Sequence, residues 1–311
     1  MKTNVVVKTK NLSREEWLKY RTKGIGGSDV SIIAGINPFK SVHQLWLEKT
    51  EQVEPEEQQS EYSHFGTLLE PIVRKEFMER TGISVRQKHM LLQSKEYPFM
   101  FADVDGVINE DGEICIFEAK TASAYKQETW EEEVPAPYIL QVQHYMAVTG
   151  AKKTYIAALV GGNHFYYHEV LRDEEMIAKI IAMEKYFWEY HVLGGVEPVP
   201  DGSEATTKYF NEKFATTNGE TVELPEEALS ICGEYDRISA EIKKLELEKN
   251  AAINQLKSIM KEAEYGTVGE RKISWKEISK SGFDSKKLKA EQPEIYNNYV
   301  TQSSYRRFSV A

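Results

Sequence analysis

The sequence predicts an α/β protein, with a core of mixed strands and helices at residues 1–200 and a long helix with a small basic α/β cap at 201–311. Three observations support this division. Short apolar runs alternate with helical apolar spacing through the first region, which is typical of an α/β core. Beyond the turn residues 198–202, a heptad-like apolar spacing fills 225–264. The last stretch, 266–311, is basic, with nine Lys and Arg and five Asp and Glu.

Helix signals dominate the beginning of the chain. Ser13 and Glu16 form a capping box, which predicts a first helix that runs toward Arg21. Gly35 and Gly82 each follow a stretch of helical spacing, where a helix commonly ends. The spacing predicts further helices at 30–34, 41–47 and 65–78, and the acidic segment 51–60 predicts a solvated loop.

The middle of the chain has the pattern of strands. Two apolar runs, 101–108 and 114–121, are joined by the turn residues 109–113 and predict a β-hairpin. A second hairpin is predicted around Gly161 and Gly162. In sequence order, the remaining predictions are a strand at 83–92, a helix at 135–150, strands at 155–160 and 165–170, and a long helix at 174–193.

The C-terminal region predicts one long helix and two strands. Apolar residues of 225–264 follow one another at steps of three and four. This spacing permits pairing with a second copy of the chain as well as packing on the core. Alternating residues at 272–278 predict a strand, and 305–310 predicts a second. We expect this basic, aromatic cap to contact DNA or a neighbouring subunit.

Three charged side chains of the first hairpin predict a catalytic site. Asp105 belongs to its first strand, and Glu118 and Lys120, two residues apart on its second strand, share one face. Paired carboxylates hold a hard cation, and an ammonium group beside them can meet a phosphate, as metal-assisted phosphodiester hydrolysis requires. The alternative is a solvated strand face. The apolar neighbours Ile116 and Phe117 favour the first reading, because they indicate partly buried charges that need partners.

Further polar positions bear on this site. Glu70, near the start of a helix, can add a carboxylate or simply interact with the helix dipole. Gln141 and Gln143 share a helix, and their spacing lets only one of them face the strands. Arg21 and Ser28, before and within a glycine-rich segment, can bind a phosphate together with free N–H groups of the next helix. Each of these signals is common outside active sites.

The composition of the chain excludes several other classes. No apolar run reaches about 18 residues, so no transmembrane helix is expected, and the N-terminus lacks the pattern of a signal peptide. Cys115 and Cys232 are too few and too far apart for a disulfide framework or a zinc site, and predict a reducing, cytoplasmic setting. The net charge of −10 argues against a general duplex binder. It combines +4 at 266–311 with −14 elsewhere, which is compatible with one local basic channel for nucleic acid.

Taken together, these motifs resemble the YqaJ-type viral recombinases, the PD-(D/E)xK nuclease group that includes phage lambda exonuclease. The resemblance covers residues 15–195 and implies a restriction-endonuclease-like core, in which helices flank a mixed central β-sheet. Val104 stands where the usual motif has a proline. Six motifs in order carry the resemblance: Arg21, Gly24–Ser28, Gly66 with Glu70, Asp105–Gly106, Glu118–Lys120 and Gln141–Met146.

The resemblance implies a metal-dependent reaction. Asp105, Glu118 and the Ala119 carbonyl would hold Mg²⁺, for which Mn²⁺ can substitute. Lys120 would position or activate the attacking water and counter the charge of the transition state. The expected metal ligands are therefore Asp105, Glu118 and Ala119, and the expected catalytic residues are Asp105, Glu118, Lys120, Glu70 and Gln141.

The resemblance also implies roles for four supporting residues. Glu70 would be an additional acid and Gln141 a supporting group on the core helix. Arg21 and Ser28 would bind the 5′-phosphate of the strand being cut. Together they would surround the end of a DNA duplex.

The implied activity is processive 5′→3′ exonuclease digestion of linear double-stranded DNA. It would leave 3′ single-strand overhangs for a strand-annealing protein in phage-type recombination, in a bacterial host cell and from a phage or prophage. A homo-oligomer is expected, with a closed trimer ring as one hypothesis, although residues 201–311 have no counterpart in the short lambda-type enzymes. Two alternatives remain: a non-catalytic recombination mediator that binds DNA ends, and a sequence-specific endonuclease on the same fold.

Overall fold

The computed structural model describes residues 3–53, 60–301 and 303–310. The chain divides into two compact units, Met1–Lys213 and Phe214–Ala311. The acidic loop predicted at 51–60 falls mostly on residues 54–59, which lie outside the described residues. In the parts of the chain that are described, no helix has the length and apolarity to cross a membrane.

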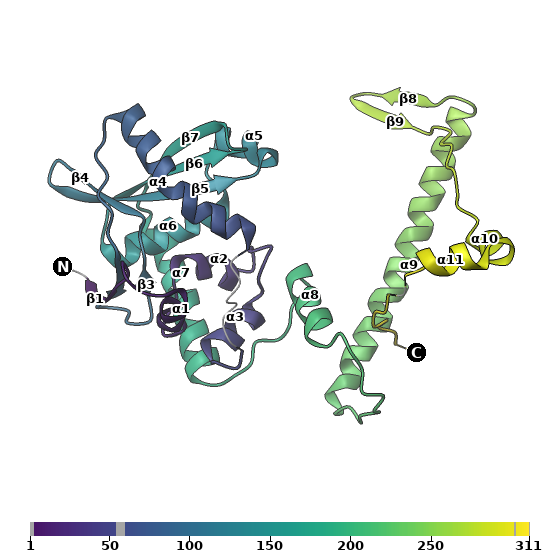
Figure 1. Ribbon diagram of the computed structural model, residues 1–311, viewed down its shortest axis with the longest axis horizontal. Coiled ribbons are helices and arrows are strands. Elements are labelled where there is room, and N and C mark those ends of the chain that lie inside the picture. Colours follow the sequence, from purple (N-terminus) through teal and green to yellow (C-terminus); the bar gives the residue numbers. More distant parts are fainter. Residues whose placement is uncertain (1–2, 54–59, 302, 311) are drawn as a thin grey trace. The chain divides into compact units, whose positions relative to one another are not determined.

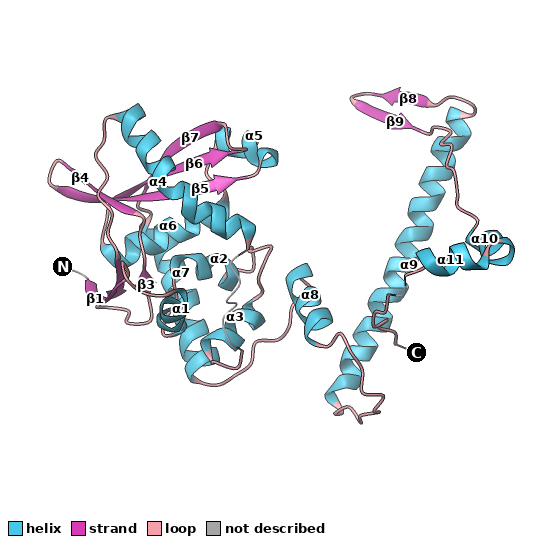
Figure 2. Ribbon diagram, in the orientation of Figure 1, coloured by secondary structure: helices cyan, strands magenta, loops and turns pink. Residues whose placement is uncertain are grey.

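A mixed four-stranded sheet forms the centre of the first unit (Figure 2). Its strands, in spatial order, are β4 (Gly106–Glu110), β5 (Glu113–Ala122), β6 (Lys153–Val160) and β7 (His164–Leu171). β5 and β6 run parallel, and each outer strand pairs antiparallel with its neighbour. A parallel pair needs a long connection, which here contains α5 (Gln127–Glu132) and α6 (Ala136–Thr149). Both predicted hairpins and the mixed α/β fold are confirmed.

Helices cover both faces of this sheet, because successive residues of β5 alternate between two cores. Phe117 packs with Phe77 of α4 (Glu61–Thr81) on one face, with ring centroids 5.0 Å apart. Figure 1 shows α4 lying across this sheet. Ile116 points to the other face, where it joins the larger core with Val142 of α6. The same alternation sends Glu118 and Lys120 to the α6 face.

A second, three-stranded sheet contains the N-terminal strand, which the sequence did not predict. β1 (Thr3–Lys8) pairs with β2 (Met90–Ser94), and β2 pairs with β3 (Phe101–Ala102), both antiparallel. The prediction of one strand over 101–108 is therefore wrong, because the chain leaves this sheet after Ala102 and enters the central sheet at Gly106. The predicted strand at 83–92 is also wrong over most of its length, since in this described stretch a single bridge, Arg86 to Val107, precedes β2.

Three short helices follow β1. α1 (Arg14–Thr22) and α3 (Val42–Lys49) each begin with a capping box, and the first of these boxes was predicted. α2 (Gly27–Ile33) begins earlier than the predicted range 30–34 and packs against α6. The predicted helix 65–78 also begins earlier, since Ser60 caps α4.

Two more helices complete the first unit. α7 (Glu174–Tyr186) continues as a π-helical stretch, Phe187–Leu193, so the long helix predicted at 174–193 is confirmed with a changed winding at its end. α8 (Glu204–Lys213) was not predicted. Its Tyr209 and Phe210 rings lie 5.9 and 5.7 Å from the ring of His43 in α3. This packing extends the first unit beyond residue 200, to Lys213.

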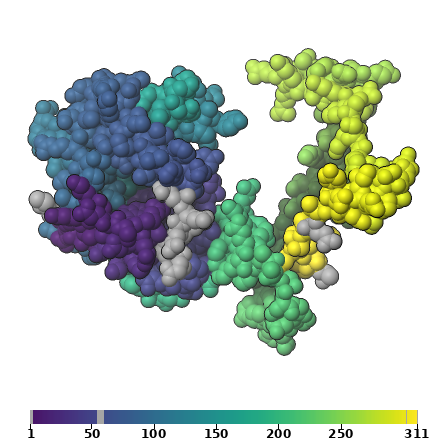
Figure 3. All heavy atoms as spheres, in the orientation of Figure 1, coloured from purple at the N-terminus to yellow at the C-terminus, as the bar shows by residue number. Residues whose placement is uncertain are grey.

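The second unit contains one long helix and several short elements. They are α9 (Glu227–Met260), β8 (Tyr265–Val268), β9 (Arg271–Ser274), α10 (Ser285–Glu291) and α11 (Pro293–Tyr299). The predicted long helix is confirmed, and the strand predicted at 272–278 is present as the shorter β9. The strand predicted at 305–310 is wrong, because the described residues 303–310 form none. In Figure 3 the β8–β9 hairpin, in yellow-green, extends as a narrow arm.

Candidate active site

The β4–β5 hairpin brings the predicted catalytic residues together. Its turn needs left-handed backbone at Gly112, where φ is +86°, and the Gly112 N–H donates to Asn109 Oδ1 at 3.2 Å. At the other end of β4, Gly106 follows Asp105, and a Cβ there would lie 2.5 Å from Val85. Because Gly106 pairs with Phe117, Asp105 lies beside Glu118 and Ala119 of β5.

The carboxylates of Asp105 and Glu118 each accept hydrogen bonds from neighbouring groups. Asp105 Oδ2 accepts a hydrogen bond from the Ala119 N–H at 2.8 Å. Glu118 Oε1 accepts from Lys120 Nζ at 2.6 Å and from Gln141 Nε2 at 2.8 Å. The other oxygen, Glu118 Oε2, is buried and has no hydrogen-bond partner among the described residues. A buried carboxylate oxygen without a donor is costly, so this atom is available to a cation.

The charges of the three residues are mutually dependent. Burial raises the pKa of Asp105 well above its usual range, and the Glu118 carboxylate adds to the shift. Burial also raises the pKa of Glu118, although Lys120 opposes the shift. Burial disfavours the Lys120 cation, but the charges of Glu118 and Asp105 outweigh it and raise its pKa. Lys120 is therefore a cation at neutral pH, held between two acids that resist ionisation.

This donor set fits a hard divalent cation. Mg²⁺ and Mn²⁺ prefer carboxylate and carbonyl oxygens, which Asp105, Glu118 and Ala119 provide. A positive ion between the two carboxylates would offset the cost of burying their charges, which raises both pKa values, and the repulsion by Glu118 that adds to the shift of Asp105. Within the described ranges, no group of three or more His, Cys, Asp or Glu side chains has the geometry of a metal site. The two carboxylates with a main-chain oxygen are accordingly the set to test.

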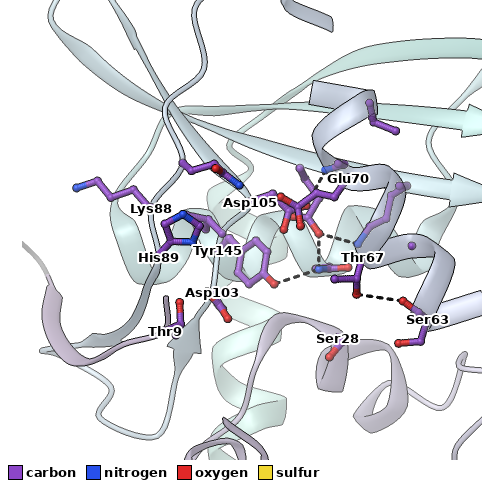
Figure 4. Close-up of a pocket in the computed structure, with 18 of the residues that line it drawn as sticks. Thr9, Ser28, Ser63, Thr67, Glu70, Lys88, His89, Asp103, Asp105 and Tyr145 are labelled. Carbon is purple, nitrogen blue, oxygen red and sulfur yellow. Dashed lines mark hydrogen bonds and ion pairs between the residues drawn. The ribbon is translucent and has the colours of Figure 1, made fainter. Parts of the chain in front are cut away.

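All eight predicted site residues line one cleft of about 580 Å³ (Figure 4). The hairpin supplies four of them, α4 and α6 supply one each, and Arg21 and Ser28 come from α1 and α2. The set comprises Arg21, Ser28, Glu70, Asp105, Glu118, Ala119, Lys120 and Gln141. Their convergence agrees with a common site, while the role of each residue stays a prediction.

The two glutamines of α6 point in different directions. Gln141 donates to Glu118 and also to the Tyr145 hydroxyl, at 3.1 Å. Gln143 donates to the Leu171 carbonyl at 2.7 Å and accepts from the Asp173 N–H at 3.0 Å. Gln141 therefore faces the cleft, and Gln143 joins α6 to the end of β7.

Glu70 reaches the cleft from α4 as a paired acid. Its Oε1 accepts from Arg74 Nη1 at 2.8 Å, one helical turn away. Its charge still contributes to the raised pKa values of Asp105 and Glu118. In Figure 4 the side chains of Glu70 and Asp105 point toward one another.

The glycine-rich segment holds Arg21 against the start of α2. Arg21 Nη2 donates to Ser28 Oγ at 3.0 Å and to Asp29 Oδ1 at 2.7 Å. A Cβ at Gly26 would lie 3.1 Å from Arg21 Cζ, so a glycine makes room for the guanidinium group. A Cβ at Gly27 would lie 2.5 Å from the Tyr145 ring. Packing therefore explains both glycines, and it brings α2 close to α6.

Several residues that line the cleft were not predicted from the sequence. Trp17 Nε1 donates to Asp103 Oδ2 at 3.0 Å, and both residues line the cleft. Tyr138 lies under Lys120, whose Nζ is 5.0 Å from the ring centroid. The spacing of Asp103 to Asp105, two acids on one face of an extended segment, was a usable signal. Trp17 and Tyr138 had none, because aromatic residues in helices most often belong to the core.

Comparisons with known proteins give concordant results. Residues 16–152 match the model of the YqaJ-like viral recombinase domain. The chain is 43% identical over 313 aligned positions to the uncharacterised protein YqaJ of Bacillus subtilis. The alignment covers 99% of this chain and 98% of that protein.

Among solved structures, the chain is similar to LHK-Exo in complex with dAMP. The TM-score is 0.50 at 20% identity, over 64% of this chain and 97% of the other. A second structure, of the alkaline exonuclease LHK-Exo from Laribacter hongkongensis, gives a TM-score of 0.47 at 19% identity, over 58% of this chain and 93% of that one. The first likeness supports the restriction-endonuclease-like fold of the core.

Proposed function

The chain belongs to the YqaJ-like viral recombinase family, and from that premise we propose that it is a metal-dependent deoxyribonuclease. Its substrate would be linear double-stranded DNA, digested processively from the 5′ end. The product would be a duplex with 3′ single-strand overhangs, suited to recombination by strand annealing.

One observation carries this proposal most strongly. Glu118 is a buried carboxylate with one unpartnered oxygen, beside the buried Asp105 and within hydrogen-bond distance of Lys120. A module that only binds DNA gains nothing from two acids that face a polyanion, because they repel phosphate. Metal-assisted phosphodiester hydrolysis instead requires carboxylates that can bind a cation.

The proposed chemistry assigns a task to each side chain. Asp105, Glu118 and the Ala119 carbonyl would hold Mg²⁺, which when bound supplies positive charge to the phosphate and acidifies a water molecule. Lys120, a cation by virtue of its raised pKa, would stabilise the extra negative charge of the transition state. Gln141 holds Glu118 in place and Glu70 adds negative charge near the cation.

Arg21 and Ser28 would bind the 5′-phosphate at the end of the strand being cut. The guanidinium group donates to the Ser28 hydroxyl, and both lie in the cleft that contains the carboxylates. A guanidinium group beside a hydroxyl group suits a phosphate group. The structure of LHK-Exo in complex with dAMP supports a nucleotide site in a protein of this fold. The proposed partners are a single-strand annealing protein and further copies of this chain, with a closed trimer ring as the hypothesis for their assembly.

A digestion assay with two forms of one DNA tests the proposal. A linear 5′-phosphorylated duplex and the same sequence as a closed circle are incubated with the full chain in Mg²⁺, with or without EDTA. We expect acid-soluble nucleotide from the linear form alone, and none in EDTA. End-labelled strands give the direction, because the 5′ label is released first.

Other outcomes would favour the two alternatives. Binding of the linear duplex without release of nucleotide in Mg²⁺ or Mn²⁺ would identify an end-binding mediator. Cutting of the circle at fixed positions would identify a sequence-specific endonuclease. Either result would contradict the proposed exonuclease.

A further inference from the structure

Lys49, the last residue of α3, is a buried cation that the proposed chemistry does not use. Its side chain is 4% exposed. Nζ donates to the Arg21 carbonyl at 2.7 Å, to the Gly24 carbonyl at 2.7 Å and to Asp29 Oδ2 at 2.8 Å. An ammonium group has three donors, so all of them are used here. Lys49 thus connects α3 to the end of α1 and the start of α2.

Asp29 relays this contact to the cleft. Its Oδ2 accepts from Lys49 and from the Gly26 N–H at 2.9 Å, and its Oδ1 accepts from Arg21 Nη2 at 2.7 Å. Arg21 is less buried, with 21% of its side chain exposed, and lines the cleft. Its Cζ also lies 5.2 Å from the centroid of the Trp17 ring. The guanidinium group is therefore fixed from several directions.

Arg21 and Lys49 are cations, and Asp29 is the anion that accepts hydrogen bonds from both of them. The carboxylates of Asp103 and Glu48 act on Arg21 from further away, and Glu48 also acts on Lys49. Burial alone would raise the pKa of Asp29, but Arg21 and Lys49 hold it well below its usual range, so Asp29 remains ionised. Buried charges are costly unless paired. Two cations share the one carboxylate to which both are bonded, and Arg21, the least buried of the three groups, lines the cleft, so it can also bind an anion there.

We propose that Lys49 and Asp29 are positioning residues, which hold Arg21 in the orientation that binds the 5′-phosphate of a DNA end. The inference rests on the proposed function, because the anion is taken to be that terminal phosphate. It assigns to the Lys49–Asp29 pair the ability of the protein to distinguish a 5′-phosphate from a 5′-hydroxyl end. If Lys49 only connected α3 to α1, its replacement would lower thermal stability and leave the preference for 5′-phosphate over 5′-hydroxyl ends unchanged.

The test compares two linear duplexes of one sequence, with 5′-phosphate or 5′-hydroxyl ends, on Lys49→Met, Asp29→Asn and the wild type. The readouts are the ratio of kcat/KM for the two ends in Mg²⁺ and the ratio of Kd values in EDTA, where no cutting occurs. We expect wild-type ratios that favour the phosphate and a fall of about tenfold or more in both variants, the scale of loss when a supporting group is removed. Lys153→Met is the matched control, because Lys153 also donates hydrogen bonds, to Tyr155 and Glu169. It is the first residue of β6, whereas Lys120 pairs with Ala158 near the other end of that strand. The ratio of this control variant should equal that of the wild type.

Several outcomes would overturn the inference. Folded variants that keep the wild-type ratio would show that the pair is only structural, as would a wild type without any preference in either assay. If Lys49→Met does not fold, Asp29→Asn carries the test, because it keeps the shape of the side chain. A wild type that cuts neither duplex but binds the phosphorylated end more tightly would refute the nuclease proposal and leave the inference to be judged from the Kd ratios.

Discussion

The substitution Glu118→Gln separates the charge of the site from its shape. Glu118 Oε1 accepts from Lys120 and Gln141, and an amide oxygen can accept the same two bonds. The amide nitrogen would replace Oε2, which has no partner in the wild type among the described residues. The variant therefore keeps both hydrogen bonds and loses one negative charge, which in the wild type repels Asp105 and attracts Lys120.

The expected effects on activity and stability have opposite signs. A bound cation contributes several kcal/mol to transition-state stabilisation, so a loss of about 4 kcal/mol corresponds to a roughly thousandfold lower kcat/KM. Without a cation, the variant should be at least as stable as the wild type, because burying the Glu118 charge costs more than its attraction to Lys120 returns, and the repulsion with Asp105 is removed. Glu118→Ala instead leaves Lys120 without its bonded partner, at a cost of about 3 kcal/mol. For a unit of this size, that corresponds to a Tm lower by roughly 6–12 °C.

The assay measures initial nucleotide release from linear duplex in Mg²⁺, and thermal unfolding in EDTA, for the wild type and both variants. Activity of the glutamine variant within about tenfold of the wild type would refute the role of Glu118 as a cation ligand. A glutamine variant that unfolds well below the wild type in EDTA would refute the claim that the buried carboxylate is a liability without its cation.

Three further predictions concern pH, α6 and α2. Because burial raises the pKa values of Asp105 and Glu118, the cation-free native state binds more protons than the unfolded chain. Its stability should therefore fall as the pH rises from about 4 through these raised values, and Mg²⁺ should reverse the loss; unfolding curves against pH that are flat would contradict this. Gln141→Ala should lower kcat about 10- to 100-fold with a small change in Tm, whereas Gln143→Ala should lower stability by about 1–3 kcal/mol and leave kcat unchanged; equal kinetics of the two variants would refute their separate assignments. Gly27→Ala should destabilise the fold by about 1–3 kcal/mol, because its Cβ would lie 2.5 Å from a ring atom of α6; an unaltered denaturation midpoint would contradict the close packing.

The convergence of the hairpin's charged residues could be predicted from the sequence because it depends on local geometry. A strand has a period of two, so Glu118 and Lys120 necessarily share a face. The turn residues at 109–113 set the register of the hairpin, and that register brings Asp105 to β5. The positions of Glu70 and Gln141 near the hairpin depend on tertiary packing. They were predicted only through the resemblance to a family that has the same motifs in the same order.

Long-range contacts account for what the sequence did not predict. Nothing in the apolar run at 101–108 indicates that it is divided between two sheets. Its first residues belong to the smaller sheet because Phe101 pairs with Gln93 of β2. β1 depends entirely on a partner strand more than eighty positions away, as the pairing of Thr3 with Ser94 shows. Alternation at 305–310 suggested a strand, but a strand requires a partner, and the described residues provide none there.

The positioning cluster was also beyond sequence reasoning. Lys49 is the last residue of a helix, where a basic residue is ordinarily explained by the helix dipole. Asp29 had the usual pattern of a helix cap. Their contact joins α3 to α2 across twenty positions, and nothing in the spacing of the two residues predicts it.

A crystal of the full chain with a short 5′-phosphorylated duplex and Mn²⁺ tests the central claim most directly. Anomalous scattering locates manganese independently of the protein atoms. We predict a manganese peak coordinated by Asp105, Glu118 and the Ala119 carbonyl, with Lys120 on the same side of β5. Bound DNA with no manganese between the two carboxylates would contradict it.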